Sequence, residues 1–205
     1  MNKPISRLTP VILAGGKSSR MGQDKAFVKL GNQPMIEVIL AKLLPLFCLP
    51  PLIITNQPEK YTYLGLQVQV DRLPRMGPLS GIHAGLYYAS SPFIFLVGCD
   101  HPLLNSAVIC YMQNQIADYD IIVPDYDGYR HPLHAIYSRN CMNAIEVMLG
   151  QDNRKLTDIF GKVKVRYIQS DEFEGIPDAG QSFVNVNTPA DLAKVQTFFN
   201  KGDLG

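Results

Sequence analysis

Short apolar runs alternate along this chain with longer segments in which apolar residues recur every three or four positions. The short runs are rich in Val, Ile and Leu, as is typical of buried strands, and the longer spacing is typical of helices with one buried face. Strands are predicted at residues 11–13, 52–55, 67–70, 93–97 and 121–123. Helices are predicted from Pro34 to Leu44 and at residues 80–89, 104–117, 141–149 and 189–199.

This alternation predicts an α/β fold in three layers, with helices packed on a mainly parallel, Rossmann-like sheet. Asp125-Tyr-Asp-Gly128 lies between apolar runs and predicts a hairpin turn, so the later part of the chain is expected to add antiparallel strands and make the sheet mixed. Thr188, just before Pro189, is the predicted N-cap of the last helix. With 205 residues and no repeat or low-complexity linker, residues 1–205 are expected to form a single domain.

A loop rich in glycine and basic residues, LAGGKSSRMGQDK, follows the first predicted strand. Gly15 and Gly16 lack a Cβ and can bring backbone N–H groups close to an anion, while Arg20 and Lys25 supply positive charge. The loop is no P-loop, because the earlier glycine position of that motif holds Val11, and it lacks the dinucleotide G-x-G-x-x-G pattern. It indicates a polyphosphate clamp, with a solvated glycine turn as the alternative.

Polar side chains follow three of the other predicted strands, namely Asn56, Asp71 and Asp100. Ligands of open α/β sheets bind at the carboxyl ends of strands, and Mg²⁺ takes one or two carboxylates there. Asp100 is therefore the predicted metal ligand, with capping of the following helix as the alternative. Near the end of the chain, Asn185 and Asn187 are expected to lie on one side of an extended segment and to face a ligand or brace a turn.

The 19 basic and 18 acidic residues give a formal net charge of +1, with no basic surplus that would favour nucleic acid or a membrane surface. The apolar runs are far shorter than the roughly 20 residues that span a bilayer, so a cytoplasmic protein is expected. Four cysteines are widely spaced and are expected to fill the core in a reducing compartment: Cys48, Cys99, Cys110 and Cys141.

The four histidines do not predict a catalytic or zinc site. His131 and His134 are three residues apart but have no cysteine or acidic ligand nearby, which argues against zinc. His83 and His101 lie near the expected cleft, yet neither is paired in sequence with a nucleophile and an orienting acid.

Five motifs, taken in order, resemble those of the molybdenum cofactor guanylyltransferase family, often called MobA: LAGGKSSRMGQDK, RMGPLSG, GCDHPLL, HPLHAIY and FVNVNTP. The first is shared with a wider group of nucleotidyltransferases that includes sugar-nucleotide and cytidylyl enzymes, but its combination with FVNVNTP is far more specific. The resemblance covers about residues 11–192. It implies a nucleotidyltransferase fold and a transfer of GMP from GTP to molybdenum-bearing molybdopterin, with Mg²⁺ as cofactor and pyrophosphate as the leaving group.

The resemblance also implies roles for individual residues. The catalytic residues would be Lys25, Arg20 and Asp100, with Asp100 as the magnesium ligand. GTP would be bound by Leu13, Ala14, Gly15, Gly16, Gly22, Lys25, Asn56, Asp71 and Asp100. The acceptor or reaction centre would include Asn185 and Asn187. A guanine preference is implied because cytidylyl relatives tend to carry Ala-Ala-Gly in place of Ala14-Gly15-Gly16.

Alternative functions stay open at this point. A related cytidylyl- or sugar-phosphate nucleotidyltransferase would use the same phosphate clamp, and a non-catalytic nucleotide-binding partner in molybdoenzyme assembly would need only binding. Molybdoenzyme-assembly proteins are the candidate protein partners. His101 is a departure from the family, which more often has a small polar residue after the aspartate. The lack of a nucleophile–base pair is no objection to the transfer, because a phosphate acceptor with a second pKa of about 6 is already ionised near neutral pH.

Overall fold

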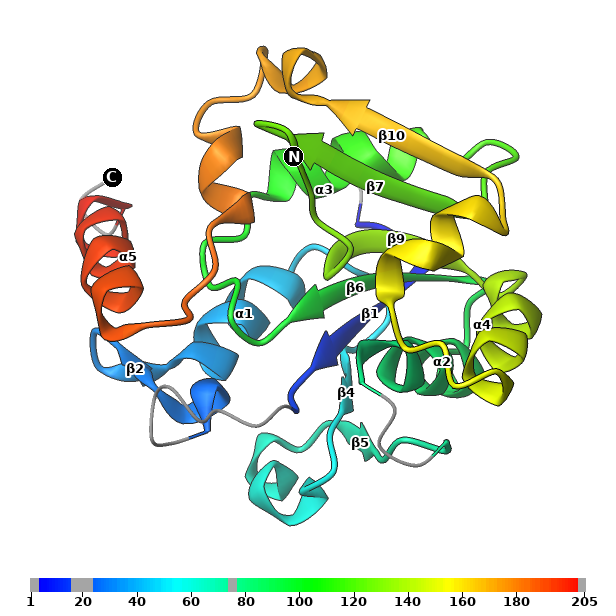
Figure 1. Ribbon diagram of the computed structural model, residues 1–205. Coiled ribbons are helices and arrows are strands. Elements are labelled where there is room, and N and C mark those ends of the chain that lie inside the picture. Colours follow the sequence, from blue (N-terminus) through cyan, green and yellow to red (C-terminus); the bar gives the residue numbers. More distant parts are fainter. Residues whose placement is uncertain (1–3, 16–23, 74–76, 203–205) are drawn as a thin grey trace.

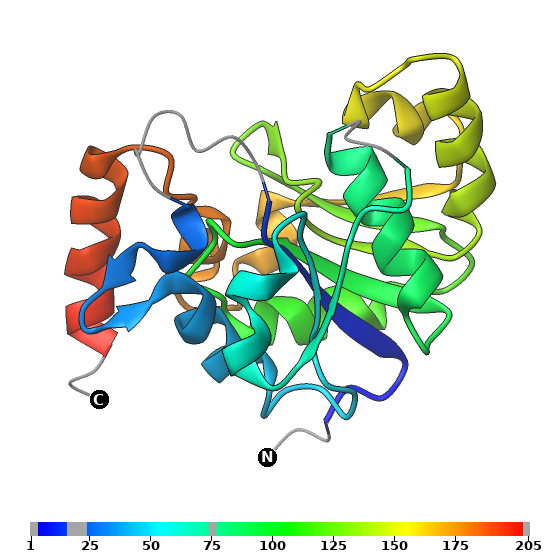
Figure 2. The same cartoon turned by 90° about the horizontal axis from the view of Figure 1, so that it is seen from below.

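A computed structural model of the chain describes residues 4–15, 24–73 and 77–202. A central sheet crosses the molecule, and helices cover both of its faces (Figure 1 and Figure 2). The strands of this sheet are β1 (Leu8–Leu13), β4 (Leu52–Ile54), β5 (Gln67–Gln69), β6 (Phe93–Gly98), β7 (Ile121–Tyr126), β8 (Tyr129–Arg130), β9 (His134–Ser138) and β10 (Val165–Gln169). A separate two-stranded hairpin consists of β2 (Lys29–Leu30) and β3 (Gln33–Pro34).

The strand order is β10-β7-β9-β6-β1-β4-β5, with β8 paired to β7. Strand β1 runs parallel to β4 and β6, β4 is parallel to β5, and β10 is parallel to β7. Strand β9 lies between β6 and β7 and is antiparallel to both. The predicted mainly parallel, mixed sheet is confirmed.

The helices are α1 (Met35–Leu43), α2 (Pro78–Tyr88), α3 (Ser106–Asn114), α4 (Cys141–Gly150) and α5 (Pro189–Gly202). Helices α1 and α3 share one core with Ile12 and Phe95, whereas α2 and α4 share another with Val11 and Leu96. Neighbouring residues of a strand point to opposite faces of the sheet, so the two cores lie on opposite faces and the predicted three-layer α/β/α arrangement is confirmed. Among the described residues, no helix has both the length and the apolar character needed to span a membrane.

The direction of chain crossover reverses at β1. The chain passes from β1 through α1 to β4 on one side, and from β5 through α2 to β6 on the other side of β1. Right-handed crossovers that run in opposite directions place their helices on opposite faces. The carboxyl end of β1 is therefore a topological switch point, where open α/β sheets bind their ligands.

Several element boundaries differ from the sequence prediction. Pro34 precedes α1 instead of starting it, because its ψ of 143° is extended and it pairs with Lys29 in the hairpin. Helix α3 is shorter than residues 104–117, and Asn105 caps it by accepting hydrogen bonds from the N–H groups of Ala107 and Val108. Asn105 thus fills the capping role considered for Asp100.

The predicted turn at residues 125–128 is confirmed as the connection between β7 and β8, where Tyr126 pairs with Tyr129. The core-filling role expected of the four cysteines is wrong for Cys48, which is exposed, and right for Cys99 and Cys141. Sequence patterns also missed the short hairpin and β10, which have too few residues or too little apolar periodicity to be recognised locally.

A third, smaller core joins an early segment of the chain to a late one. It consists of Val28, Leu30, Met35, Val38, Val186 and Val195. These residues come from β2 and the position just before it, from α1, from the segment before α5 and from α5 itself. Figure 1 shows α5 beside β2, away from the central sheet. This packing brings residues near position 25 to residues near position 187.

Candidate functional site

Four residues, three of them with polar side chains, lie in a row along the carboxyl edge of the sheet. Asp100 follows β6, Gly15 follows β1, Asn56 follows β4 and Asp71 follows β5, in the spatial order of the strands. Since neighbouring strands are about 4.8 Å apart, the row is roughly 14 Å long. An elongated ligand such as a nucleoside triphosphate matches a row of this kind.

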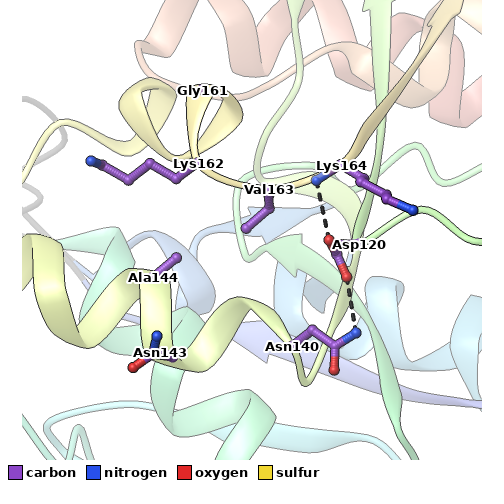
Figure 3. A pocket seen from close by; sticks show the side chains of 8 residues that line it. All are labelled: Asp120, Asn140, Asn143, Ala144, Gly161, Lys162, Val163 and Lys164. Atoms are coloured by element: carbon purple, nitrogen blue, oxygen red, sulfur yellow. Dashed lines mark hydrogen bonds between the residues drawn. The ribbon is translucent and has the colours of Figure 1, made fainter.

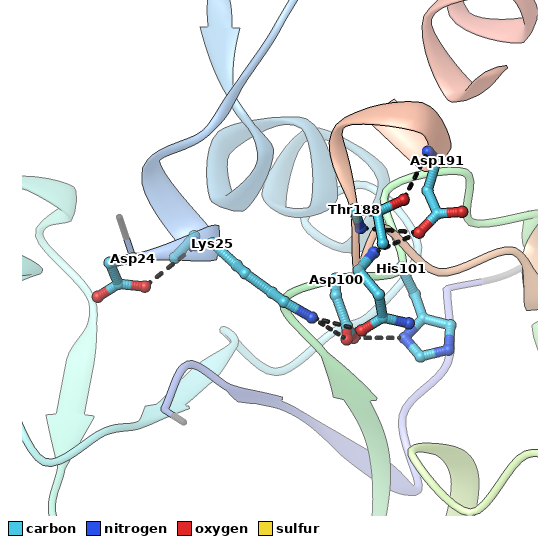
Figure 4. A network of polar contacts seen from close by, with 8 residues as sticks. Asp24, Lys25, Asp100, His101, Thr188 and Asp191 are labelled. Carbon is cyan, nitrogen blue, oxygen red and sulfur yellow. Dashed lines mark hydrogen bonds and ion pairs between the residues drawn. The ribbon is translucent and has the colours of Figure 1, made fainter. Parts of the chain in front are cut away.

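Lys25 links two distant parts of the chain at one end of this row. It begins η1 (Lys25–Phe27), and its Nζ donates to Asn187 Oδ1 at 2.5 Å and to Asp100 Oδ2 at 3.3 Å. The Lys25 and Asp100 side chains are only 19% and 18% exposed, so the ion pair is largely shielded from water. Figure 4 shows the ammonium group pointing at the Asp100 carboxylate.

The carboxylate of Asp100 is held in its ionised form. Burial by itself would raise its pKa, but the hydrogen bond and charge of His101 and the charge of Lys25 outweigh burial, so the pKa of Asp100 is lowered. His101 Nδ1 lies 2.9 Å from Asp100 Oδ1. An anionic oxygen is therefore available at this edge at neutral pH.

Asp24 and Tyr61 support the position of Lys25. Asp24 Oδ1 accepts a hydrogen bond from Ala26 N at 3.2 Å and so starts η1. The buried Tyr61 hydroxyl donates to Asp24 Oδ2 at 3.4 Å and lies 3.5 Å from Ala14 O. Tyr61 thereby joins the end of β1 to the residue before Lys25, a role that no sequence pattern indicated.

A capping box fixes the backbone around Asn187. Asp191 Oδ2 accepts from Asn187 N at 3.0 Å and from Thr188 N at 2.8 Å, and Asp191 N donates to Thr188 Oγ1 at 3.2 Å. Thr188 is confirmed as the N-cap of α5. Val186 N donates to Asp100 O at 2.8 Å, so this segment is also tied to the end of β6. The T-x-x-D spacing could have revealed Asp191 from the sequence.

The two late asparagines have different surroundings. Asn187 is half-buried and contacts Lys25. Asn185 is exposed and is separated from Asn187 in the sequence by the buried Val186. Of these two amides, it is Asn187 that the structure brings to Lys25 and Asp100. The backbone between them is not regular strand, which is why the period of two did not place both amides in the Lys25 network.

Asn56 and Asp71 form a pair at the other end of the row. Asn56 Nδ2 donates to Asp71 Oδ2 at 3.2 Å. Each residue follows the last residue of its strand by two positions, and those last residues, Ile54 and Gln69, are partners in the β4–β5 register. Burial raises the pKa of Asp71, and the hydrogen bond from Asn56 opposes this. The register of β4 and β5 thus brings together two residues that the sequence analysis singled out separately.

The residues after β1 lie between the Lys25 network and the Asn56–Asp71 pair. Leu13 O accepts from Cys99 N at 3.0 Å, and Ala14 N donates to Ile54 O at 2.9 Å. Gly15 is exposed, and no described atom lies within 4 Å of the position that a Cβ would take there. Among the described residues, nothing therefore blocks close approach of a ligand to the backbone of Gly15. The predicted residues Gly16, Arg20 and Gly22 lie outside the described residues.

The oxygen donors near Lys25 fit a hard divalent cation. Asp100 and Asn187 each present a side-chain oxygen to the same ammonium group, and such oxygens are the ligands that Mg²⁺ takes in proteins. Within the described ranges no three His, Cys, Asp or Glu side chains are grouped to hold a metal. A magnesium ion at this edge would thus rest on Asp100 and Asn187, and would take its other ligands from phosphate and water.

Comparisons with known proteins show the family to which this chain belongs. The family model "MobA-like NTP transferase domain" matches residues 10–166. The chain is 37% identical over 197 residues to the "Probable molybdenum cofactor guanylyltransferase" of Pelotomaculum thermopropionicum, covering 96% of each chain. The chain belongs to the MobA-like NTP transferase family. It is also 34% identical over 202 residues to the "Molybdenum cofactor guanylyltransferase" of Desulfosudis oleivorans, covering 98% of this chain and 100% of that protein.

A solved structure supports the MobA-like fold. The molybdopterin-guanine dinucleotide biosynthesis protein A of Archaeoglobus fulgidus superimposes with a TM-score of 0.83 at 24% identity, covering 95% of this chain and 100% of that chain. At this identity the likeness concerns the fold. The central sheet with its helical layers is therefore the nucleotidyltransferase fold that the motifs predicted.

The three other histidines of this MobA-like protein take part in contacts within the fold. His83 in α2 is buried and lies 2.8 Å from Glu146 of α4. His131 and His134 pack against Phe183, and burial lowers the pKa of His131 to about 4. Both rings are thus part of the packing beneath the carboxyl edge of the sheet.

A polar depression lies at the opposite edge of the sheet (Figure 3), lined by Asp120, Asn140, Asn143, Ala144, Gly161, Lys162, Val163 and Lys164. Asp120 precedes β7 and so lies at the amino end of a strand that runs in the same direction as β6. Its carboxylate accepts from Asn140 Nδ2 at 3.0 Å and from Lys164 N at 3.1 Å. Both carboxylate oxygens of Asp120 thus accept hydrogen bonds from the surrounding chain.

Proposed function

We propose that this protein transfers GMP from GTP to the terminal phosphate of molybdenum-bearing molybdopterin. An acceptor oxygen forms a bond to the α-phosphorus of GTP, the bond from that phosphorus to the α–β bridging oxygen breaks, and pyrophosphate leaves with the electron pair. The observation that carries the proposal is the Lys25 ammonium between Asp100 and Asn187, at the switch point of a MobA-like fold. The names of the relatives supply the nucleotide and the acceptor.

Each residue of the network has a task that the transfer needs. Lys25 would balance negative charge on the triphosphate and on the leaving pyrophosphate. Asp100 and Asn187 would hold magnesium, which when bound neutralises phosphate charge. No side chain has to remove a proton from the acceptor, because its phosphate is already ionised at neutral pH. The residues present are thus charge and positioning groups, as the transfer requires.

The rest of the row would bind the nucleoside. Leu13, Ala14 and Gly15 would lie along the nucleotide, and the Asn56–Asp71 pair would hold the guanosine part. Arg20, Gly16, Gly22 and Asn185 keep their proposed roles in phosphate and acceptor binding. The guanine preference rests on Gly15-Gly16 and on the relatives' names.

The wider setting follows from the same reaction. We propose that residues 1–205 act as one nucleotidyltransferase domain in the cytoplasm, where GTP is available. Proteins that assemble molybdoenzymes would receive the dinucleotide product.

The test is an assay of acceptor-dependent pyrophosphate release with GTP, CTP and UTP in turn, with molybdenum-bearing molybdopterin as acceptor. We expect activity with GTP only. Lys25→Met and Asp100→Asn should each lower kcat by about 10²- to 10³-fold, the usual cost of removing one group that stabilises transition-state charge. Lys29→Met, which removes an exposed lysine of β2, is the matched control and should keep full activity.

The outcomes separate the alternatives. A response to CTP alone would contradict the guanine assignment, and transfer to a sugar phosphate instead of the pterin would contradict the acceptor. Nucleotide binding without any turnover would support a non-catalytic partner. Full activity in both the Lys25 and Asp100 variants would show that the proposed network is not the reaction centre.

A further inference from the structure

The carboxylate of Asp100 has a different partner on each oxygen. Oδ2 faces the Lys25 ammonium at 3.3 Å, and Oδ1 lies 2.9 Å from Nδ1 of His101. Figure 4 shows the carboxylate between the lysine and the imidazole ring. An ionised carboxylate only accepts hydrogen bonds, so Nδ1 of His101 must carry the proton in this contact.

The backbone after β6 makes this contact between neighbouring side chains feasible. His101 N donates to Gly98 O at 3.2 Å, and this hydrogen bond closes a turn that runs from Gly98 to His101. A Cβ at position 98 would lie 2.6 Å from Asp100 Oδ1 and 3.3 Å from His101 Nδ1. The Asp100 carboxylate and the His101 ring thus occupy the space that the Cβ of any other residue at position 98 would need.

The ring of His101 cannot easily turn away from Asp100. His101 is 5% exposed, and its ring lies 6.1 Å, between centroids, from the ring of His134. His134 is itself fully buried and packs edge-on against Phe95 of β6 and Phe183. The donor that faces Asp100 is thus held by packing that extends into the sheet.

We propose that His101 is a positioning residue, whose Nδ1–H fixes one oxygen of Asp100 so that the other faces the metal and triphosphate, and that Gly98 supplies the room for this hydrogen bond. The inference rests on the proposed function for the role of Asp100 as a metal ligand. Hydrogen bonds to a ligating carboxylate set its orientation, and losing such a partner costs roughly 10- to 100-fold in metal affinity.

The principal experiment measures Mn²⁺ binding by electron paramagnetic resonance, with the protein saturated with a non-hydrolysable GTP analogue and no acceptor. His101→Leu and His101→Gln should weaken Mn²⁺ binding by roughly 10- to 100-fold. His101→Asn places an amide N–H near the position of Nδ1 and should stay within about threefold of wild type. Gly98→Ala should match His101→Leu although the histidine is intact, and Gly150→Ala, at a glycine with open space around it, is the control.

Wild-type Mn²⁺ affinity in a folded His101→Leu variant would overturn the proposal, and so would equal losses in His101→Asn and His101→Leu. If the His101 variants do not fold, long-range ¹H–¹⁵N NMR of the wild-type protein still tests the proposal, because it shows which ring nitrogen of His101 carries the proton. A protonated Nδ1 that loses its hydrogen-bond shift in Asp100→Asn supports the proposal, and a ring protonated only at Nε2 overturns it. The proposed function fails separately, if wild-type protein does not transfer GMP although its metal binding depends on His101.

Discussion

Single carboxylates in this protein are stabilised by several donors at once. Glu172 accepts hydrogen bonds from both terminal nitrogens of Arg166, from Gln169 N at 2.9 Å and from the Tyr111 hydroxyl at 3.2 Å. Burial acts to raise its pKa, but Arg166 and the Gln169 N–H outweigh burial, so the pKa of Glu172 is lowered. This carboxylate should therefore stabilise the fold only where it is ionised.

Replacing Glu172 with Gln should lower the free energy of unfolding by about 1–3 kcal/mol at about pH 7, the usual value for hydrogen bonds to charged groups. Because the folded-state pKa lies below the ordinary value of 4.5, the wild-type advantage is fully present above that value. It should disappear as the pH falls through the lowered folded-state pKa. Urea unfolding at a series of pH values measures this difference.

The exposed neighbour Glu174 provides the control, since Glu174→Gln removes the same charge without the Arg166 contact. It should change the free energy of unfolding very little at any pH. A Glu172→Gln penalty that persists unchanged in acid would contradict the ionic explanation.

Close packing of one helix shows how elements constrain single positions. Gly81 and Gly85, one turn apart in α2, face the sheet. A Cβ at position 85 would lie 3.0 Å from Val11 Cγ1 and 3.3 Å from Ile94 Cδ1, whereas at position 81 the nearest atom would be Leu13 Cδ2 at 3.0 Å. The end of a leucine side chain can move, but the branched side chain of the buried Val11 cannot move without shifting its strand.

We expect Gly85→Ala to destabilise the protein by about 1–3 kcal/mol, since overpacking of the core outweighs the gain in helix propensity. Gly81→Ala should cost less, and Gly150→Ala at the end of α4 should be neutral or stabilising by up to about 1 kcal/mol. Thermal unfolding of the three variants gives the comparison. A Gly85→Ala protein as stable as wild type would show that α2 can move away from the sheet.

The third core controls the site at the scale of the whole molecule. Lys25 precedes the β2–β3 hairpin and Asn187 precedes α5. The hairpin packs against α5 and the segment before it through Leu30, Val186 and Val195. The contact between Lys25 and Asn187 joins residues 162 positions apart. Loosening this core should therefore disturb the site as well as the fold.

Val195→Ala should cost about 2 kcal/mol in the free energy of unfolding and should also lower acceptor-dependent kcat, because α5 no longer holds Asn187 firmly against Lys25. Val123→Ala makes the same change at an equally buried position of β7 in another core. It should cost similar stability and leave kcat unchanged. Equal losses of kcat in both variants would contradict a specific link between the third core and the site.

Local patterns were enough to predict the layers and part of the site. Apolar runs and helical periodicity marked β1, β4, β5, β6 and β7 and all five α-helices of the described chain, with errors at their ends. Lys25 was predicted as a cation of the glycine-rich loop after β1, and Asp100 because it follows a buried strand at the edge where open α/β sheets bind ligands. Gly98 and Tyr61 were not predicted, since their roles depend on neighbours that the sequence does not reveal.

The α/β class, the α/β/α layering and the polar carboxyl edge could be predicted from the amino-acid sequence, because each depends on periodicity or on the residue that ends a strand. The antiparallel insertion of β9 between β6 and β7, and the contact of Lys25 with Asn187 instead of Asn185, became visible in the folded chain alone. Strand order and such distant contacts depend on the packing of segments far apart in the chain, and no local pattern records that packing.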